Sequence, residues 1–488
     1  MTDRISNRFT TLARRAVLRG LLAVLLLACA PSVARGEPVR VVVEPIEPGV
    51  ARVHIDARPG DGPARVRFSD ALGTFEGVIR VLPTFGRAGV PGLELAWRAT
   101  PGEILTGLGQ RFDAFDHHGN RVDMWIEDAP LQEDGKTYAC VPILYSSAGY
   151  ALCAADNPEG VFDLNSADDG VHRYQRAGLE LTLHVVLRET LEDQVRALIP
   201  RIGLPAGMPD WAWGPWISKN SYENQAEAED ALQGHFDRDI PVSVIVQEAW
   251  KGPSEQGLFN AWAFPGWDDI PGFLEMCEAR GVKNVLWQVP VLHPSSPHFA
   301  EAHAKGWIVR KPDGTPSLRE AWLAGFGNLD FTNPDAVRWW QDQLRPLVRM
   351  GVVGFKADDG EDIKPDDVFH DGRRGWEMHN EYTMLYAKAL AELMEQEGVD
   401  GMIWARSASL GQQAYPALWA GDQYATWEQM ATLIPAGLSS GLSGMPFWSH
   451  DIGGYAGTCE PELYIRWAQF GALSLFKQYH GIEAREPW

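Results

Sequence analysis

From residue 207 onward, short apolar runs alternate with longer stretches that have the periodicity of amphipathic helices. Helical patterns lie, for example, at residues 267–281 and 333–351. We predict eight strands between such stretches, at residues 211–218, 241–250, 283–291, 351–359, 401–408, 417–422, 444–451 and 473–480. Eight strand-and-helix units in succession are typical of a (β/α)8 TIM barrel, which is an α/β fold. The pattern therefore predicts a barrel over residues 207–488.

The preceding part of the chain is strand-like and is punctuated by glycine, proline and aspartate. Apolar or alternating runs occur at residues 39–45, 51–57, 64–70, 77–83, 93–99 and 179–187. Short strands at regular spacing indicate a β-sandwich. We therefore predict an N-terminal β-sandwich domain over residues 38–205, followed by the barrel.

Residues 1–34 have the pattern of a signal peptide. Five arginines precede the apolar stretch 21–30, which is too short to span a bilayer. A cleavage site follows Ala34, but the residues that end at Cys29 resemble the lipobox of bacterial lipoproteins, in which Cys29 becomes a lipid anchor. The segment LARRAVLRG also resembles a twin-arginine signal. Each alternative predicts an exported protein, periplasmic or extracellular, without a membrane-spanning segment.

Charge argues against two classes of partner. The chain has 43 lysines and arginines against 65 aspartates and glutamates, a net charge of −22 at pH 7. Such a surface repels nucleic acids and anionic lipid headgroups, so we predict neither as a partner. The 20 tryptophans fit two hypotheses equally well, namely aromatic faces that stack on sugar rings and filling of the hydrophobic core.

Cysteine spacing argues against a zinc site, because the sequence has no C-x-x-C motif and no cluster of cysteine with histidine. Four cysteines follow the predicted signal peptide. Two apolar runs flank Ser146 and Ser147, which predicts a hairpin that turns there and places Cys140 opposite Cys153. A disulfide is then expected in an oxidising compartment, with two reduced core cysteines as the alternative.

Six of the predicted barrel strands end in polar or aromatic side chains. These ends are Gln247 and Glu248, Trp287 and Gln288, Asp358 and Asp359, Arg406 and Ser407, Asp422, and His450 and Asp451. The carboxyl ends of barrel strands meet on the face where active sites lie. The set is rich in carboxylates and aromatic rings and poor in histidine, which favours glycoside hydrolysis over a metal centre.

Four segments resemble glycoside hydrolase family 31, the family of α-glucosidases and α-xylosidases. GFKADDGE resembles the family's nucleophile strand, and WARSASLGQQAYPALWAGD resembles its acid/base segment. FWSHDIGGY is similar to the family's F-W-S-H-D-I-G-G-F signature. GLGQRFDAFDHHGNRVDMW resembles the segment by which the N-terminal domain contributes a loop to the site. The resemblance extends from about residue 105 to the end of the chain.

The resemblance implies a role for each matching residue. Asp358 is then the catalytic nucleophile and Asp422 the general acid/base, with no metal or organic cofactor. The other matches would bind or enclose the reacting sugar; they are Arg406, His450 and Asp451 at its hydroxyls, Trp287, Trp419 and Trp448 as pocket walls, and Lys356 beside the nucleophile. Gln247 and Glu248 stand where many α-glucosidases bind the distal hydroxyls through an aspartate, so the sugar is left open.

The residues after the nucleophile depart from the family's pattern. Asp359 stands where the family has an aromatic residue, and its charge needs water, lysine or arginine as a partner. We expect Glu361 to orient its neighbours and Asp362 to be solvated. Relatives continue beyond the position of Trp488 through a last barrel helix and C-terminal β-domains, which this chain is expected to lack.

The leading hypothesis is a retaining α-glycosidase that hydrolyses terminal α-linked sugars, such as an α-glucoside or α-xyloside, by double displacement. One alternative is a carbohydrate-binding protein that has lost turnover. Another is an α-glucan lyase or transglycosylase, which uses the same covalent intermediate. In each case the expected partner is a glycoside or an oligosaccharide.

Overall fold

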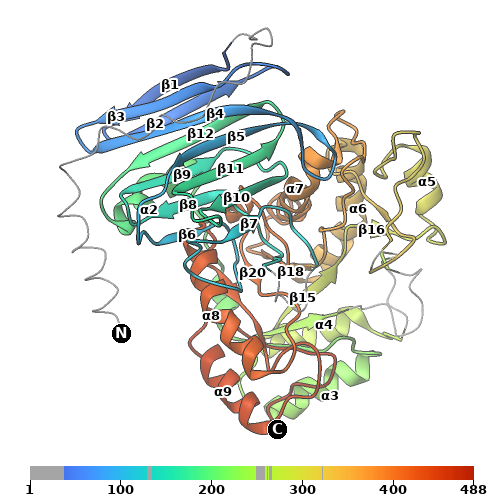
Figure 1. Cartoon of the computed structure of the whole chain (residues 1–488). Helices are drawn as coiled ribbons and strands as arrows, with labels where there is room; N and C mark the ends of the chain where they lie inside the picture. The colour runs from blue at the N-terminus through green and yellow to red at the C-terminus, as the bar shows by residue number, and fades with distance from the viewer. Residues whose placement is uncertain (1–37, 129–134, 249–258, 261, 263–265, 321) are drawn as a thin grey trace.

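The computed structural model describes residues 38–128, 135–248, 259, 260, 262, 266–320 and 322–488. It contains a β-sandwich followed by a parallel barrel that is surrounded by helices (Figure 1), which confirms the predicted fold class. The signal peptide predicted for residues 1–34, with Cys29, lies outside the described residues. Within the described segments, no helix combines the length and the apolar character needed to cross a bilayer.

Two six-stranded antiparallel sheets form the sandwich. The first has the order β1 (Arg40–Glu47), β2 (Val50–Asp56), β12 (Glu180–Leu187), β9 (Tyr150–Ala154), β8 (Ile143–Ser146) and β6 (Leu105–Gly107). The second has the order β3 (Ala64–Asp70), β4 (Gly73–Phe85), β5 (Val90–Arg98), β11 (Val171–Ala177), β10 (Gly160–Leu164) and β7 (Arg121–Asp123). Alternate side chains, such as Val53 on β2 and Leu95 on β5, are buried in the shared core. Helix α2 (Leu191–Ile202) then leads into the barrel.

The predicted hairpin of β8 and β9 is present, but its register differs from the predicted one. The two strands pair Cys153 with Ile143 and not with Cys140. Gly149 adopts φ +95°, which permits a turn longer than the one we predicted. The thiol of Cys140 lies instead 3.5 Å from a guanidinium nitrogen of Arg111. The four cysteines in the described part of the chain are free, so the predicted disulfide is wrong.

Nine parallel strand segments form the barrel. Their order is β21 (Trp448–Ser449), β20 (Leu418–Trp419), β19 (Met402–Ala405), β18 (Val352–Ala357), β15 (Lys283–Gln288), β14 (Val244–Gln247), β13 (Pro215–Ser218), β23 (Lys477–Tyr479) and β22 (Asp451–Ile452). Only His450 separates β21 from β22, so the chain itself joins the two edges of the sheet. These two segments correspond to the seventh of the eight predicted strands.

Helices cover the outside of the barrel (Figure 1). They are α3 (Gln225–Phe236), α4 (Ile270–Ala279), α5 (Phe299–Ala304), α6 (Pro334–Met350), α7 (Gly375–Gln396), α8 (Trp427–Leu442) and α9 (Pro461–Gly471). The described residues also include 3₁₀ turns at Asp210–Trp213 and Gln412–Ala414 and the short strands β16 (Val291–Leu292) and β17 (Gly327–Asn328). Helix α6 matches its prediction because Asn333 caps its first turn and Gly351, at φ +119°, ends it.

The tryptophans of the barrel occupy two kinds of place, the hydrophobic core and the wall of a cavity. Trp216, Trp404 and Trp419 pack in one hydrophobic cluster of the barrel, where the rings of Trp404 and Trp216 lie 5.1 Å apart. Trp419 also borders the cavity described below, together with Trp287 and Trp322.

Candidate active site

A cavity of about 460 Å³ opens at the carboxyl ends of the barrel strands. Its charged lining consists of Asp128, Glu248, Lys356, Asp358, Arg406 and Asp422. Its aromatic lining consists of Phe259, Trp287, Trp322, Trp419, Tyr424 and Tyr455. Charged groups between aromatic faces match a sugar, because a sugar ring presents both hydroxyl groups and apolar C–H faces.

The strand ends place the charged residues. Glu248 directly follows β14, Asp358 directly follows β18 and Arg406 directly follows β19. Asp422 lies three residues beyond the end of β20. Because the strands are parallel, their carboxyl ends converge on one face of the barrel. The structure thus brings these four predicted residues together in one cavity.

Arg406 connects the two carboxylates that the sequence singled out. Its Nη1 atom lies 3.1 Å from Oδ1 of Asp358 and 3.6 Å from Oδ2 of Asp422. Its Nε and Nη2 atoms donate to the two oxygens of Glu361 at 2.8 and 2.9 Å. The Arg406 side chain is only 2% exposed, so this forked contact fixes it. One guanidinium nitrogen therefore holds Asp358 and Asp422 close to each other.

Two further donors orient the carboxylate of Asp358. The indole Nε1 of Trp287 donates to Oδ2 at 2.8 Å. The backbone N–H of Asp359 donates to Oδ1, also at 2.8 Å. Together with Arg406, these contacts aim donors at both oxygens, and a carboxylate held in this way is suited to attack an electrophile in one direction.

Asp422 lies in a different electrostatic environment. Burial raises its pKa, and the neighbouring Asp358 raises it further, whereas Arg406 lowers it; the result is a pKa of about 7. A carboxyl group with such a pKa is protonated in a large fraction of molecules at neutral pH. The two neighbouring carboxyl groups are thus suited to different tasks, one to donate a proton and the other to attack.

The floor of the cavity is a buried ion pair. The Nζ atom of Lys356 donates to Oε1 of Glu248 at 2.5 Å, and it lies 4.7 Å from the centre of the Trp419 ring. Ser218 donates to the same Glu248 oxygen at 3.2 Å. Burial raises the pKa of Glu248 to about 7, although Lys356 opposes the shift. At the closed end of the cavity, these groups can form hydrogen bonds with the hydroxyls of a bound sugar.

Four predicted site residues do not line the cavity. Strand alternation turns Trp448 and His450 toward the surroundings of the barrel: Trp448 donates to Gln110, and His450 accepts a hydrogen bond from Trp467 on α9. Asp451 is fully buried, and its two carboxylate oxygens have no hydrogen-bond partner among the described residues.

Gln247, the fourth of these residues, lies on the helix-facing side of β14. It borders a crevice formed with residues of α4, such as Phe273. Glu248, the next residue, faces the cavity because successive strand residues point to opposite sides. The structure therefore corrects the placement of Gln247, Trp448, His450 and Asp451 next to the sugar.

Sequence reasoning missed several residues of the cavity. His480 ends the eighth predicted strand, and Tyr455 is the last residue of FWSHDIGGY, so both carried a signal that could have identified them. Asp128 comes from the sandwich domain, shortly after the segment GLGQRFDAFDHHGNRVDMW. Asn220 follows β13 and accepts a hydrogen bond from the Tyr455 hydroxyl at 2.8 Å. Trp322 lies in a long loop, where the sequence carries no strand-end signal.

The acidic residues after Asp358 are each paired with an arginine. Asp359 is buried and bound by Arg319, which confirms that its charge needs a basic partner. Glu361 orients Arg406, as we expected. Asp362 accepts a hydrogen bond from Nε of Arg319 at 3.0 Å and is 24% exposed, so the prediction of a solvated side chain is wrong.

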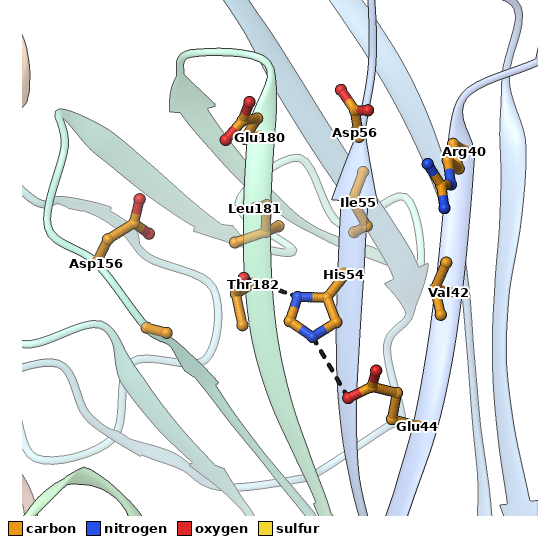
Figure 2. Close-up of a pocket in the computed structure, with 11 residues that line it drawn as sticks. Arg40, Val42, Glu44, His54, Ile55, Asp56, Asp156, Glu180, Leu181 and Thr182 are labelled. Carbon is orange, nitrogen blue, oxygen red and sulfur yellow. Dashed lines mark hydrogen bonds and ion pairs between the residues drawn. The ribbon is translucent and has the colours of Figure 1, made fainter.

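A second, wider hollow lies on the outer face of the sandwich (Figure 2). It has a volume of about 560 Å³ and is formed by β1, β2 and β12. His54 at its centre contacts Thr182 at 3.1 Å and Glu44 at 3.5 Å. Its described lining contains no tryptophan, tyrosine or phenylalanine, and therefore no face on which a sugar ring could stack. We place the candidate active site in the barrel for this reason.

Glu103, His118 and His172 form the one described group with the geometry for a metal ion, because their ligand atoms lie within 4.8 Å of one another. However, Glu103 already accepts hydrogen bonds from Ser146 at 2.6 Å and from Tyr150 at 3.2 Å, and it contacts His172 at 2.5 Å. Because its oxygens already have these partners, we interpret Glu103 as part of a buried hydrogen-bond network of the sandwich core.

Comparison with known proteins identifies the family of the two domains. Residues 205–488 match the model of the glycosyl hydrolases family 31 TIM-barrel domain, and residues 86–163 match that of the family's N-terminal galactose mutarotase-like domain. An alpha-xylosidase of Emericella nidulans is 34% identical over 79% of this chain and 50% of its own length. Alpha-xylosidase XylQ of Lactiplantibacillus pentosus is 33% identical over 79% of this chain and 52% of its own length. The chain thus spans about half the length of these curated relatives.

Solved structures show the same architecture. A cycloalternan-degrading enzyme from Trueperella pyogenes, in complex with a covalent intermediate, matches 90% of this chain and 68% of its own with a TM-score of 0.75 and 26% identity. A cycloalternan-forming enzyme from Listeria monocytogenes matches 93% of this chain and 50% of its own with a TM-score of 0.79; at 22% identity it shows the fold alone. Because the barrel domain model covers more than half of the chain, this protein belongs to glycoside hydrolase family 31.

Proposed function

We propose that this chain acts as a retaining α-glycosidase. One observation carries the proposal: Nη1 of Arg406 contacts both Asp358 and Asp422 in an aromatic-lined cavity. A retaining mechanism needs a nucleophile and a proton donor about 5–5.5 Å apart, on either side of the scissile bond. Asp358, with donors aimed at its oxygens, and Asp422, with a pKa of about 7, fit these two roles.

In the first step, a carboxylate oxygen of Asp358 forms a bond to the anomeric carbon while the bond from that carbon to the leaving oxygen breaks. Protonated Asp422 gives its proton to the leaving oxygen. In the second step, ionised Asp422 takes a proton from a water molecule, whose oxygen attacks the anomeric carbon and releases Asp358. The covalent intermediate of the related Trueperella pyogenes enzyme supports this order of steps.

An α-xyloside is the first substrate to test, because two relatives above 30% identity are named alpha-xylosidases. We expect release of nitrophenol from at least one of the nitrophenyl α-glycosides of xylose, glucose, galactose and sulfoquinovose. The last is included because a sulfoquinovosidase of Escherichia coli is 24% identical over 80% of this chain. Binding of these sugars without any release would favour a carbohydrate-binding protein instead.

The stereochemistry of the product tests the mechanism. Double displacement inverts the anomeric carbon twice, so early NMR spectra of the hydrolysate are expected to show the α-anomer. The β-anomer forms only later, by spontaneous mutarotation. Initial appearance of the β-anomer would contradict a covalent intermediate on Asp358.

Transglycosylation is a second candidate function. An isomaltosyltransferase of Sporosarcina globispora is 27% identical over 79% of this chain. Trp322 and Tyr424, at the cavity, are each 40% exposed, and such rings could hold an acceptor sugar in place of water. Chromatography of the products at high substrate concentration distinguishes hydrolysis from transglycosylation, since transfer yields oligosaccharides longer than the substrate.

We also propose that the chain is exported, on the basis of the five arginines and the apolar stretch within residues 1–34. Expression in a bacterium followed by fractionation is expected to place the protein outside the cytoplasm. Incorporation of labelled palmitate that is lost in Cys29→Ser would identify a lipid anchor, whereas a soluble periplasmic product cleaved after Ala34 would identify an ordinary signal peptide.

A further inference from the structure

The residue after Asp358 has an unusual backbone conformation. Asp359 adopts φ +72°, in the left-handed region that side-chain-bearing residues disfavour. Gly360 continues the turn at φ +106°. The turn directs the backbone N–H of Asp359 to Oδ1 of Asp358, at 2.8 Å. One of the donors that orient Asp358 therefore depends on the conformation of its neighbour.

Arg319 holds Asp359 in this conformation. Its Nη2 donates to Oδ1 of Asp359 at 2.9 Å, and its Nη1 contacts Oδ2. The side chains of Arg319 and Asp359 are 3% and 0% exposed. A buried carboxylate is stable only when it is paired and hydrogen-bonded. The position of the Arg319 guanidinium therefore fixes the position of the Asp359 carboxylate. Burial raises the pKa of Asp359, but Arg319 reverses the shift and lowers it below its ordinary value, which keeps the pair charged.

The pair connects the proposed nucleophile to a loop outside the barrel strands. Arg319 lies in the segment between α5 and β17, which also carries Trp322 to the cavity. From the other side, the Ser407 hydroxyl donates to the backbone carbonyl of Asp359 at 2.6 Å. The turn after Asp358 is thus fixed at the side chain and at the carbonyl of Asp359. The N–H of Asp359 points at the nucleophile.

We propose that the Arg319–Asp359 pair is a positioning element for Asp358: it holds the left-handed turn that presents the Asp359 N–H to the attacking carboxylate. The inference rests on the proposed role of Asp358 as nucleophile. Asp359 itself does not react, because its side chain is fully buried and does not line the cavity.

The rate of covalent trapping measures positioning directly. The probes are 5-fluoro-α-D-xylopyranosyl fluoride and 5-fluoro-α-D-glucopyranosyl fluoride; Asp358 forms a bond to the anomeric carbon and fluoride leaves. We expect Arg319→Gln and Asp359→Asn each to lower the maximal inactivation rate by about 10- to 100-fold, with little change in probe affinity. The double variant is expected to react no more slowly than the slower single variant, because both changes release the same turn.

Arg176→Gln is the matched control. Arg176 is also a buried arginine, 4% exposed, and it donates to both oxygens of Asp156 at 2.5 and 2.8 Å. This pair lies in the sandwich and not at the cavity. Loss of it is expected to lower the melting temperature without changing the inactivation rate per folded molecule, which separates general destabilisation from loss of positioning.

Equal inactivation rates in folded Arg319→Gln, Asp359→Asn and the unmodified protein would overturn the proposal, as would losses that multiply in the double variant. If neither variant folds, Arg319→Lys replaces them, because lysine keeps the charge but cannot contact both oxygens of Asp359. An unchanged rate in folded Arg319→Lys counts equally against the proposal. An unmodified protein that neither fluoride labels would instead refute the proposed function. In that case a crystal structure of Arg319→Gln or Arg319→Lys still decides: the proposal requires that the Asp359 N–H no longer contact Asp358.

Discussion

Replacement of Asp358 by alanine is expected to abolish nearly all turnover, with a fall in kcat of about 10⁴-fold or more, because no other described carboxylate of the cavity is oriented by Trp287, Arg406 and a backbone N–H. Azide or formate is expected to restore part of the activity, since a small anion fits the space of the missing carboxylate. Steady-state assays with a nitrophenyl α-glycoside measure both effects.

The product identifies the position of the anion. Azide that attacks from the side of Asp358 yields a glycosyl azide of β configuration from an α-glycoside. In the unmodified protein, a fluorosugar is expected to label a single peptide, at Asp358. Label on Asp359, or an Asp358→Ala variant that stays active without azide, would contradict the assignment. Asp359→Asn serves as the comparison, because it keeps the nucleophile and is expected to lose far less activity.

Replacement of Asp422 by alanine is expected to lower the rate by an amount that depends on the leaving group of the substrate. Nitrophenol leaves without protonation, so nitrophenyl glycosides should lose little in the first step. A methyl glycoside or a disaccharide needs the proton of Asp422 and should lose about 10²- to 10⁴-fold in kcat/KM. A loss of equal size with both kinds of substrate would show that Asp422 is not the proton donor.

The pH profile follows from the same residue. Burial and Asp358 raise the pKa of Asp422 to about 7, and the acid acts only when it is protonated. For a disaccharide, kcat/KM is therefore expected to fall as the pH rises through about 7, because the proton is lost there. Glu248 titrates in the same range, with a pKa of about 7. Variants of both residues are therefore needed to assign the pH dependence to one of them. The fall in kcat/KM at higher pH should disappear in Asp422→Ala and persist in Glu248→Gln.

The fold could be predicted because period and order are properties of the sequence. A run such as 351–357 is apolar throughout most of its length, as a strand buried on both faces must be, and residues 333–351 show helical spacing with Asn333 and Gly351 at the two ends. Parallel strands deliver their ends to one face, so Glu248, Asp358, Arg406 and Asp422 could be grouped from their places at the ends of predicted strands. Their convergence is a consequence of topology alone.

The direction of a side chain near a strand end is less well determined. His450 and Trp448 were expected beside the sugar, yet the joint between β21 and β22 turns both toward the surrounding structure. Cys140 and Cys153 were expected to pair, but a turn that includes Gly149 shifts the register. A change of register reverses which residues face each other, and the sequence pattern constrains it weakly where both faces of a strand are buried.

The sequence by itself determined the two domains, the eight strands and the chemical inventory of the barrel mouth, because these depend on local periodicity and on residue type. Only the tertiary structure decided which charges meet. Arg319 reaches Asp359 across 40 residues of chain, and Asp128 enters the barrel cavity from the sandwich domain. Such contacts depend on the closure of loops and on the docking of domains. They leave no periodic trace in the sequence, because a single arginine or aspartate in a loop has the same pattern whether it is solvated or buried against a partner.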